Sequence, residues 1–236
     1  MTEDKKNLET ILGYSFINPS ILEKALTHSS YSHEIRHTTV EHNERLEFLG
    51  DQVLGLLVSE FLYKKYPDSE EGNLSHLRAH LVEAPSCASY ALKLSLQDFI
   101  KLGKGEARNQ GKGREGLLAD LFEAIVGAIF LDGGFDAVFV FFEDKLVPLL
   151  EEHLKNPPLN YKAELQKICQ KDHKVYPLYK VLEESGPEHS KLFTVGVYQL
   201  ENLLGLGTGN SKKQAEMQAA KTALEAIINR GNHEQS

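Results

Sequence analysis

Acidic residues stand on two otherwise apolar segments of the chain, at spacings that suit one face of a helix. They are Glu44, Glu47 and Asp51 on the first segment, and Asp120 and Glu123 on the second. The first three lie at i, i+3 and i+7 of a predicted helix over residues 43–54, which puts them on one stripe. Residues 116–131 are apolar almost all round, which is typical of a buried helix. Because a buried carboxylate without a partner is costly, such acids must be paired, protonated or bound to a metal.

Two such helices packed face to face would bring the acids together around a cation. Mg²⁺ takes oxygen ligands, keeps several waters, and usually combines one or two carboxylates with substrate phosphate. The acids therefore favour a magnesium site that handles phosphate groups. An alternative is that they form structural salt bridges with Arg45, Arg78 or Arg114, since buried acids in helical proteins often meet arginines. Spacing alone leaves both interpretations open.

The elements that must position these acids belong to an all-helical domain expected over residues 1–155. From Leu8 to Leu154 the apolar residues recur mostly at intervals of three and four, and strand-like alternation is scarce. Glycine and proline predict where the helices stop: Gly13, Pro19, Pro67 with Asp68, Gly72, Pro85, residues 103–116, and Gly133 with Gly134. The stiff, polar segment 156–160 predicts a linker to a second domain.

A small α+β domain is expected over residues 161–230, followed by a polar tail over 231–236. Its predicted elements follow the order α-β-β-β-α: a helix over 161–170, strands over 178–182, 192–200 and 203–207, and a helix over 212–228. Gly186-Pro187 and Glu201-Asn202 predict the turns between the strands. A helical layer on a three-stranded sheet is a common small-domain architecture.

The acidity of the chain is concentrated in the expected helical domain. A net charge of −8 does not favour binding to nucleic acid, because phosphate contacts supply much of the affinity in such proteins. Residues 156–236 hold 10 Lys/Arg against 9 Asp/Glu, which leaves 16 against 25 for residues 1–155. An acidic domain that handles phosphate groups would need cations to do so, so a metal is a natural component of it.

Features of the sequence also bear on where the protein works. The N-terminal residues carry charges and no apolar stretch, so no secretory signal is expected, and no later run is expected to span a membrane. Cys87 and Cys169 have neither metal-ligand spacing nor the density of a disulfide scaffold. The expectation is a protein of the reducing cytoplasm with no membrane partner.

Segments NERLEFLGDQVL (43–54) and LADLFEAIVGAIFLDGG (118–134) resemble the two acidic motifs of the ribonuclease III family, and residues 25–31 and 71–75 match family patterns as well. The resemblance implies a Mg²⁺-dependent endoribonuclease. It would hydrolyse double-stranded RNA to 5′-phosphate and 3′-hydroxyl ends and process ribosomal and other structured RNA precursors. It places the catalytic, metal-binding carboxylates at Glu47, Asp51, Asp120 and Glu123, with Glu44 as an accessory acid. Gln52 departs from the family, which more often has a small residue there.

The resemblance also implies RNA contacts and a homodimer. In the family two nuclease domains pair, with the aromatic residue at Phe48 reaching into the partner; the alternative is that Phe48 is a core residue. Residues 160–229 resemble a double-stranded RNA-binding domain. Its RNA-binding residues would be Gln166, His189, Lys212 and Lys213, the lysines at a helix start where phosphate is favoured. Ala163 and Lys167 depart from the family pattern in the first helix.

Other signals support different functions less well. Residues 111–116 match G-x-G-x-x-G without a preceding strand, and no Walker A motif follows, so no nucleotide cofactor is expected. Four histidines crowd one region and could ligate zinc: His28, His33, His37 and His42. Alternative functions are a double-stranded RNA-binding protein that does not cleave, and a nucleotide phosphohydrolase that uses these histidines.

Overall fold

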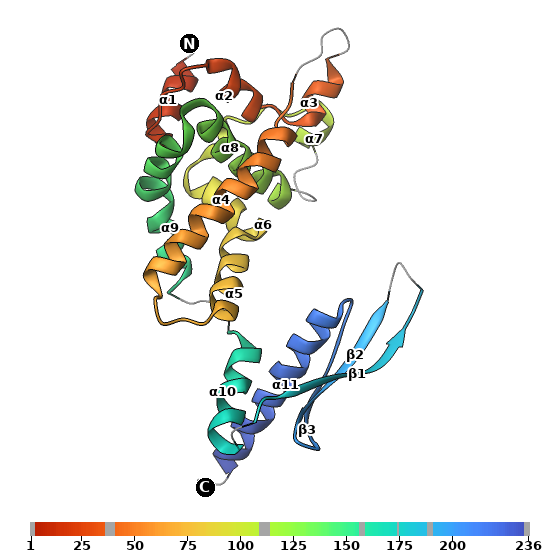
Figure 1. Cartoon of the computed structure of the whole chain (residues 1–236). Helices are drawn as coiled ribbons and strands as arrows, with labels where there is room; N and C mark the ends of the chain where they lie inside the picture. Colours follow the sequence, from red (N-terminus) through yellow and green to blue (C-terminus); the bar gives the residue numbers. More distant parts are fainter. Residues whose placement is uncertain are drawn as a thin grey trace. The chain divides into compact units, whose positions relative to one another are not determined.

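The chain divides into two compact units, Met1–Pro158 and Leu159–Ser236 (Figure 1). The computed structural model describes residues 3–35, 41–108, 114–155, 159–173, 175–187 and 191–233. The first unit is helical throughout its described parts, and the second has the order α-β-β-β-α. The predicted fold class is therefore confirmed.

The first unit packs its helices around two long ones, α4 and α8. In chain order its helices are α1 (Glu3–Leu12), α2 (Pro19–Ala25), α3 (Ser29–Glu34), α4 (Glu44–Lys65), α5 (Glu71–Val82), α6 (Ala84–Lys93), α7 (Lys104–Arg108), α8 (Arg114–Phe141) and α9 (Val147–His153), with one 3₁₀ turn over Leu96–Asp98 and one π turn over Phe142–Leu146. The core is a single hydrophobic cluster that extends from α1 to α9.

Glycine and proline mark the helix ends less simply than the sequence suggested. Gly13, with a positive φ of 67°, ends α1 as predicted. Pro19 and Pro85 begin helices instead of stopping them, because the first turn of a helix does not need the missing N–H. Gly72 lies inside the first turn of α5. Gly134, whose non-helical backbone has a φ of 76°, breaks α8 into two helical segments at a kink, so the predicted stop at Gly133 and Gly134 is confirmed.

Helix α8 is the centre of the core. Its buried residues surround most of the helix, as expected for an apolar-all-round segment, and they pack mainly against α4 and α6. By length and composition alone, residues Arg114–His153 would also suffice to cross a membrane, which corrects the expectation that no run is long enough. In the structure this apolar character serves the packing of the first unit.

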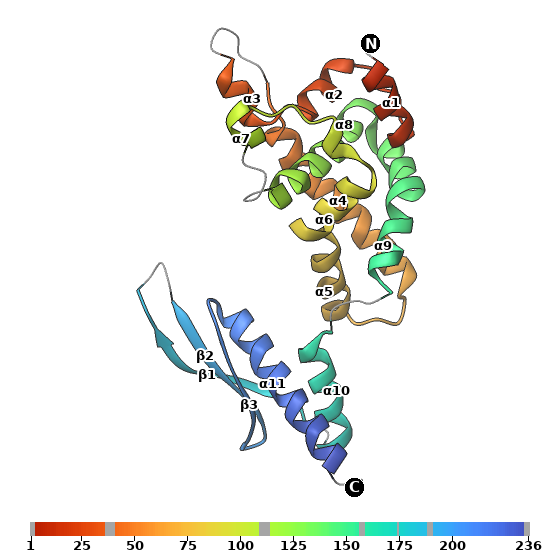
Figure 2. The same ribbon diagram turned by 180° about the vertical axis from the view of Figure 1, so that it is seen from behind.

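Helices α4 and α8 cross in both ribbon views (Figure 1, Figure 2), and their backbones come into contact at Gly50 and Gly127. A Cβ added at Gly50 of α4 would collide with the carbonyl oxygen of Glu123 and lie 2.9 Å from the amide nitrogen of Gly127. A Cβ at Gly127 would in turn collide with the carbonyl oxygen of Leu46 and lie 3.0 Å from the Gly50 nitrogen. Only a pair of glycines permits this crossing, which fixes the distance between the two acid-bearing helices.

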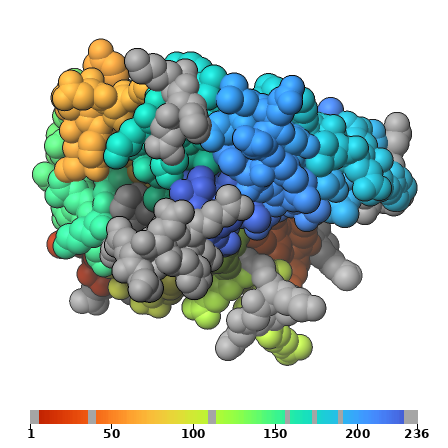
Figure 3. Space-filling model, turned by 90° about the horizontal axis from the view of Figure 1, so that it is seen from below, coloured from red at the N-terminus to blue at the C-terminus, as the bar shows by residue number. Residues whose placement is uncertain are grey.

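The second unit is an antiparallel sheet covered by two helices. Its elements are α10 (Tyr161–His173), β1 (Leu178–Ser185), β2 (Leu192–Gln199), β3 (Asn202–Gly209) and α11 (Lys212–His233), with the strands in the order β1-β2-β3. Figure 3 shows β1 and β2 side by side on the surface. The second hairpin turns at Leu200 and Glu201, one residue earlier than predicted, because Leu200 takes the left-handed conformation with a φ of 56°.

Helix α11 lies directly on β3 because both surfaces are made of small residues. A Cβ at Gly205 would lie 2.6 Å from the carbonyl oxygen of Ala219, and one at Gly209 would lie 2.7 Å from the nitrogen of Ala215. Ala215 and Ala219 are fully buried. This close packing fixes where α11 begins, and therefore where its first two lysines lie.

Candidate functional site

The two acid-bearing segments meet where α4 crosses α8. Glu47 and Asp51 lie on either side of Gly50 on α4, and Glu123 is the α8 residue whose carbonyl Gly50 contacts. Asp120 lies one turn earlier on α8. All four side chains are half-buried. The crossing of two glycines is therefore what brings carboxyl groups from distant parts of the sequence together.

Burial and neighbouring acidic charges raise the pKa of Glu47, Asp120 and Glu123. The pKa of Glu123 is raised to about 7, first by burial and then by the charges of Asp51, Glu47 and Asp120. Burial also raises the pKa of Glu47, with contributions from Asp120, Glu44 and Asp51. Burial raises the pKa of Asp120 as well. Concentrated negative charge of this kind attracts a cation.

Basic side chains do not neutralise these acids in the part of the chain that the structure describes. None of the recorded salt bridges there involves the four carboxyls. Arg78, one of the arginines considered as a partner, donates instead to Ser59 Oγ at 3.3 Å. Among the described residues, no three His, Cys, Asp or Glu side chains are already gathered around a common point. The donor set suits a hard cation, and holding one requires changes of side-chain rotamer.

Two neighbours of the acids were not identified from the sequence as part of the site. The buried side chain of Cys87, on α6, lies near Glu123 and partly opposes the rise in the pKa of that carboxyl, while its thiol donates to the Val82 carbonyl oxygen at 3.6 Å. Gln52 donates from Nε2 to Asp51 Oδ2 at 2.8 Å. A buried cysteine reads as a small hydrophobe in a sequence, and no spacing pattern links position 87 to position 123.

The outer face of α4 carries an exposed apolar stripe. Phe48 is 75% exposed, and Leu56 and Tyr63 continue the stripe along the helix. This exposure excludes the alternative that Phe48 belongs to the core of its own chain. A stripe of large apolar side chains on a surface is typical of a protein interface.

The described histidines of the predicted cluster have separate roles. His28 caps α3 by accepting a hydrogen bond from the Ser30 amide. His42 Nδ1 lies 3.8 Å from Glu44 Oε2. His33 lies in the last turn of α3, and His37 falls outside the described residues. No zinc-type cluster forms among the described histidines.

In the second unit the lysines predicted to bind RNA lie exposed at the start of α11. Lys212 Nζ forms an ion pair with Glu184 Oε1 at 2.9 Å and lies over the ring of Phe193. This bond lowers the pKa of Glu184. Lys213 has no ion pair among the described residues. Gln166 lies half-buried on α10, and His189 falls outside the described residues.

The start of α11 is fixed by a local cap. The amide of Gln214 donates to Ser211 Oγ at 3.2 Å, and the Gln214 side chain accepts from the Asn210 amide at 2.9 Å. The two bonds resemble a capping box, in which side chains satisfy free amides at a helix start. The amides that remain free there favour an anion near Lys212 and Lys213.

Comparison with known families and proteins gives matches over both units. A family model described as Ribonuclease-III-like matches residues 18–150, and one described as Double-stranded RNA binding motif matches residues 161–227. The protein Ribonuclease 3 of Protochlamydia amoebophila is 50% identical over 220 residues, which cover 93% of this chain and 90% of that protein. Ribonuclease 3 of Bdellovibrio bacteriovorus is 47% identical over 225 residues, which cover 94% and 96%.

Among solved structures, the first unit resembles the nuclease domain of Ribonuclease III from Campylobacter jejuni. The TM-score is 0.55 at 41% identity, and the match covers 63% of this chain and 97% of that one. That structure is described for flexibility in a region involved in dimer formation.

Proposed function

Because the chain belongs to the ribonuclease III family, we propose that the four carboxylates at the crossing of α4 and α8 hold the cation with which it cleaves double-stranded RNA. The family assignment makes the protein a metal-dependent endoribonuclease. We take the ion to be Mg²⁺, since every donor is a carboxylate oxygen, whereas imidazole or thiolate ligands would favour a softer metal. The observation that carries this proposal is that carboxyls of α4 and α8 lie close enough at one helix crossing to act on one another, with no salt bridge to any of the four recorded among the described residues.

In this reaction the residues of the chain bind and position the cation. Glu47, Asp51, Asp120 and Glu123 hold the cation between two helices whose spacing the glycines fix. A bound divalent ion lowers the pKa of the attacking water and neutralises the phosphate and the departing oxygen. Water then adds to phosphorus as the bond to the 3′-oxygen breaks, which leaves 5′-phosphate and 3′-hydroxyl ends. Since a proton competes with the ion for Glu123, whose pKa is about 7, ion binding strengthens as the pH rises through that value.

Two copies of the chain act together in this proposal. Cutting both strands of a duplex requires two carboxylate sites, and the exposed stripe of Phe48, Leu56 and Tyr63 offers a surface on which two α4 helices can pair. The Campylobacter jejuni relative, with its region involved in dimer formation, supports this choice. Light scattering should give the mass of a dimer at micromolar concentration, and a monomer would count against it.

We propose the domain boundaries on the same basis. We assign residues 1–155 to the dimerising nuclease domain, 156–160 to the linker, 161–230 to the double-stranded RNA-binding domain and 231–236 to a tail. Duplex RNA is recognised chiefly by shape, 2′-hydroxyls and phosphates. The proposed substrates are ribosomal and other structured RNA precursors in the cytoplasm.

Incubation with long duplex RNA tests the function directly. We expect short fragments with 3′-hydroxyl ends in Mg²⁺, intact RNA in EDTA, and no fragments from single-stranded RNA of the same sequence. Gel electrophoresis and enzymatic 3′-end labelling measure this. Binding without fragments in both conditions would favour the alternative of a double-stranded RNA-binding protein that does not cleave.

The lysines at the start of α11 should contribute to affinity and not to chemistry. Replacing Lys212 and Lys213 with Ala is expected to weaken duplex binding for any RNA sequence. Each lost phosphate contact makes the slope of log affinity against log salt shallower by about 0.9 or less, so the pair can change it by up to about 2. The rate at saturating RNA should survive, because the carboxylates lie in the other domain. Filter binding over a salt series measures both quantities.

The ion pair between Lys212 and Glu184 supplies a matched control for this experiment. Glu184→Gln releases Lys212 from its carboxylate partner and should leave binding as strong as in the wild type, or stronger. An unchanged salt slope in the double lysine variant would make the two lysines solvated surface residues. The RNA contacts would then belong to Gln166, His189 and the nuclease domain.

A further inference from the structure

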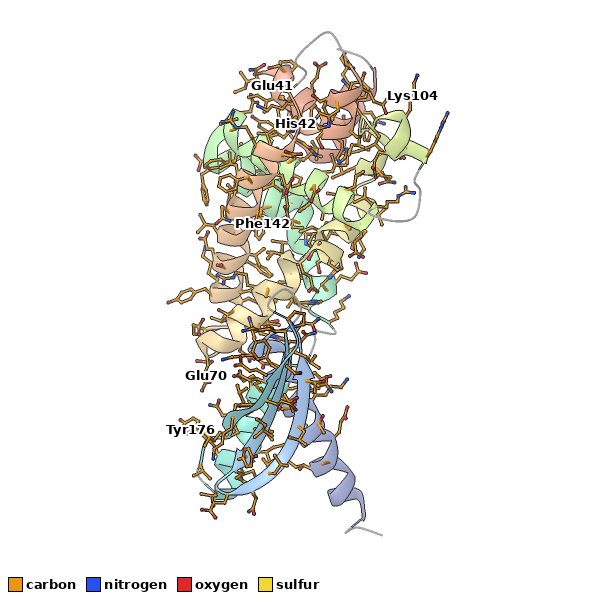
Figure 4. The ribbon with its side chains drawn as sticks, turned by 90° about the vertical axis from the view of Figure 1, so that its right-hand side faces the viewer. Glu41, His42, Glu70, Lys104, Phe142 and Tyr176 are labelled. Carbon is orange, nitrogen blue, oxygen red and sulfur yellow. The ribbon has the colours of Figure 1, made fainter. Side chains whose placement is uncertain are left out.

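The segment that carries His28 is joined by its backbone to the start of the acid-bearing helix α4. The Asn43 amide donates to the carbonyl of Thr27 at 2.9 Å, one residue before α4 begins. On its other side the segment pairs with Lys101, and the His28 amide donates to the Lys101 carbonyl at 3.1 Å. His42 precedes Asn43, and Lys104 follows Lys101 at the start of α7. Figure 4 shows these two residues at the same end of the first unit. His28 is therefore held beside the first turn of α4.

Hydrogen bonds fix which nitrogen of the His28 ring carries the proton. The Ser30 amide donates to Nδ1 at 3.2 Å, and Ser30 Oγ lies 2.8 Å from the same nitrogen. Ser30 Oγ accepts the Gly103 amide at 3.0 Å, which leaves its own proton free to point at Nδ1. Because Nδ1 is an acceptor in both bonds, the neutral ring carries its proton on Nε2.

The protonated nitrogen is the part of His28 that no described residue engages. Every hydrogen bond that the structure records for this ring is made at Nδ1. The side chain is half-buried, and it lies near enough to Asp120 for a positive charge on the ring to lower the pKa of that carboxyl. An Nε2 that carries a proton cannot be a metal ligand, so His28 offers the carboxylate site a hydrogen-bond donor instead.

We propose that His28 is a further catalytic residue, whose Nε2–H donates a hydrogen bond to a non-bridging oxygen of the RNA phosphate that is cleaved at the carboxylates. This rests on the proposed function, because it places the scissile phosphate at the crossing of α4 and α8. Carboxylates cannot bind phosphate themselves, so a fixed donor at their edge complements the cation. Negative charge builds on the phosphate oxygens as water adds, and a preoriented N–H stabilises that charge.

Two variants of His28 separate this role from that of a helix cap. His28→Asn keeps an acceptor for the Ser30 amide and loses the distant N–H. The chain already contains this cap, since Asn18 Oδ1 accepts the Ser20 amide at 3.1 Å and the Ser20 hydroxyl at 2.7 Å at the start of α2. His28→Gln places an amide N–H near the position of Nε2 and loses the cap.

Cleavage at saturating duplex RNA and thermal unfolding are measured for both variants. We expect His28→Asn to keep the wild-type Tm and KM while kcat falls by about 100-fold, the scale of losing one transition-state donor. His28→Gln should keep kcat within about threefold, and its Tm should drop by about 2–4 °C through loss of the cap. The reverse order, with Asn active and Gln inactive, would make His28 a cap alone and overturn the proposal. Equal wild-type activity of both variants would overturn it too.

Wild-type protein and Glu123→Gln, run beside these variants, separate this inference from the function on which it rests. If wild-type protein does not cut in Mg²⁺, the proposed function itself fails. If wild-type protein cuts and Glu123→Gln does not, the carboxylate site stands, and the two His28 variants decide the role of the histidine alone.

Discussion

In Mg²⁺, Glu123→Gln is expected to cleave duplex RNA roughly a thousandfold more slowly than the wild type while it binds the same RNA equally well. A neutral amide is a poor ligand for Mg²⁺, and loss of a direct ligand should exceed the roughly 10–100-fold cost of losing an outer partner. Single-turnover cleavage at saturating RNA and filter binding in EDTA measure the two quantities. Asp51→Asn should behave in the same way.

Thermal stability distinguishes this explanation from one in which the acids brace the fold. The pKa of Glu123 is raised to about 7, above its ordinary value, so the folded protein without metal holds a proton that the unfolded chain releases. The contribution of Glu123 to stability is therefore fully present below its ordinary pKa of 4.5 and is lost as the pH rises through about 7. Glu123→Gln removes this contribution, and in EDTA at pH 8 the variant should be at least as stable as the wild type.

Asp136 provides the matched control for the glutamate. It is an exposed acid on the same helix, away from the crossing, so Asp136→Asn should leave cleavage and stability unchanged. Two results would contradict the assignment of Glu123. One is wild-type cleavage by Glu123→Gln, and the other is a loss of activity that follows a matching loss of stability at pH 8.

The acids could be found in the sequence because their spacing and their apolar neighbours are local properties. Glu47 and Asp51 share a helix stripe, and Asp120 and Glu123 interrupt an apolar segment, so period and burial identify both. The contact that brings these two pairs of acids together is not a local property of the sequence. Gly50 and Gly127 read as weak helix residues, and only the packed structure reveals that each faces the backbone of the other helix.

Contacts between distant segments could not be predicted from the sequence for the same reason. The ion pair between Lys212 and Glu184 depends on how β1 lies beside the start of α11, which no local pattern specifies. The proximity of Cys87 to Glu123 depends on the packing of α6 on α8. The predicted helix stops at Pro19 and Pro85 are wrong for a local reason. Proline suits the first turn of a helix as well as the position after its end, and the sequence pattern alone does not separate the two uses.

Substitution of the glycines at the crossing should be the most damaging small change in the first unit. Gly50→Ala is expected to cost about 3 kcal/mol of unfolding free energy, because its Cβ would meet the carbonyl oxygen of Glu123 and the collision is relieved only if the two helix backbones move apart. Gly127→Ala should cost a similar amount, since its Cβ would meet the carbonyl oxygen of Leu46. For a chain of this size the melting temperature should fall by about 6–12 °C.

Cleavage should fall with the packing, even at temperatures at which these variants are still folded. Relief of the collision moves α4 away from α8, and the carboxyls at positions 47 and 51 then lie farther from those at 120 and 123. Gly116→Ala, in the first turn of α8, is the control, because a Cβ there meets nothing within 4 Å and alanine favours the helix. It should be as stable as the wild type or slightly more so. Wild-type melting and cleavage by Gly50→Ala would show that the crossing tolerates a side chain, and the carboxylate site would then need another explanation for its geometry.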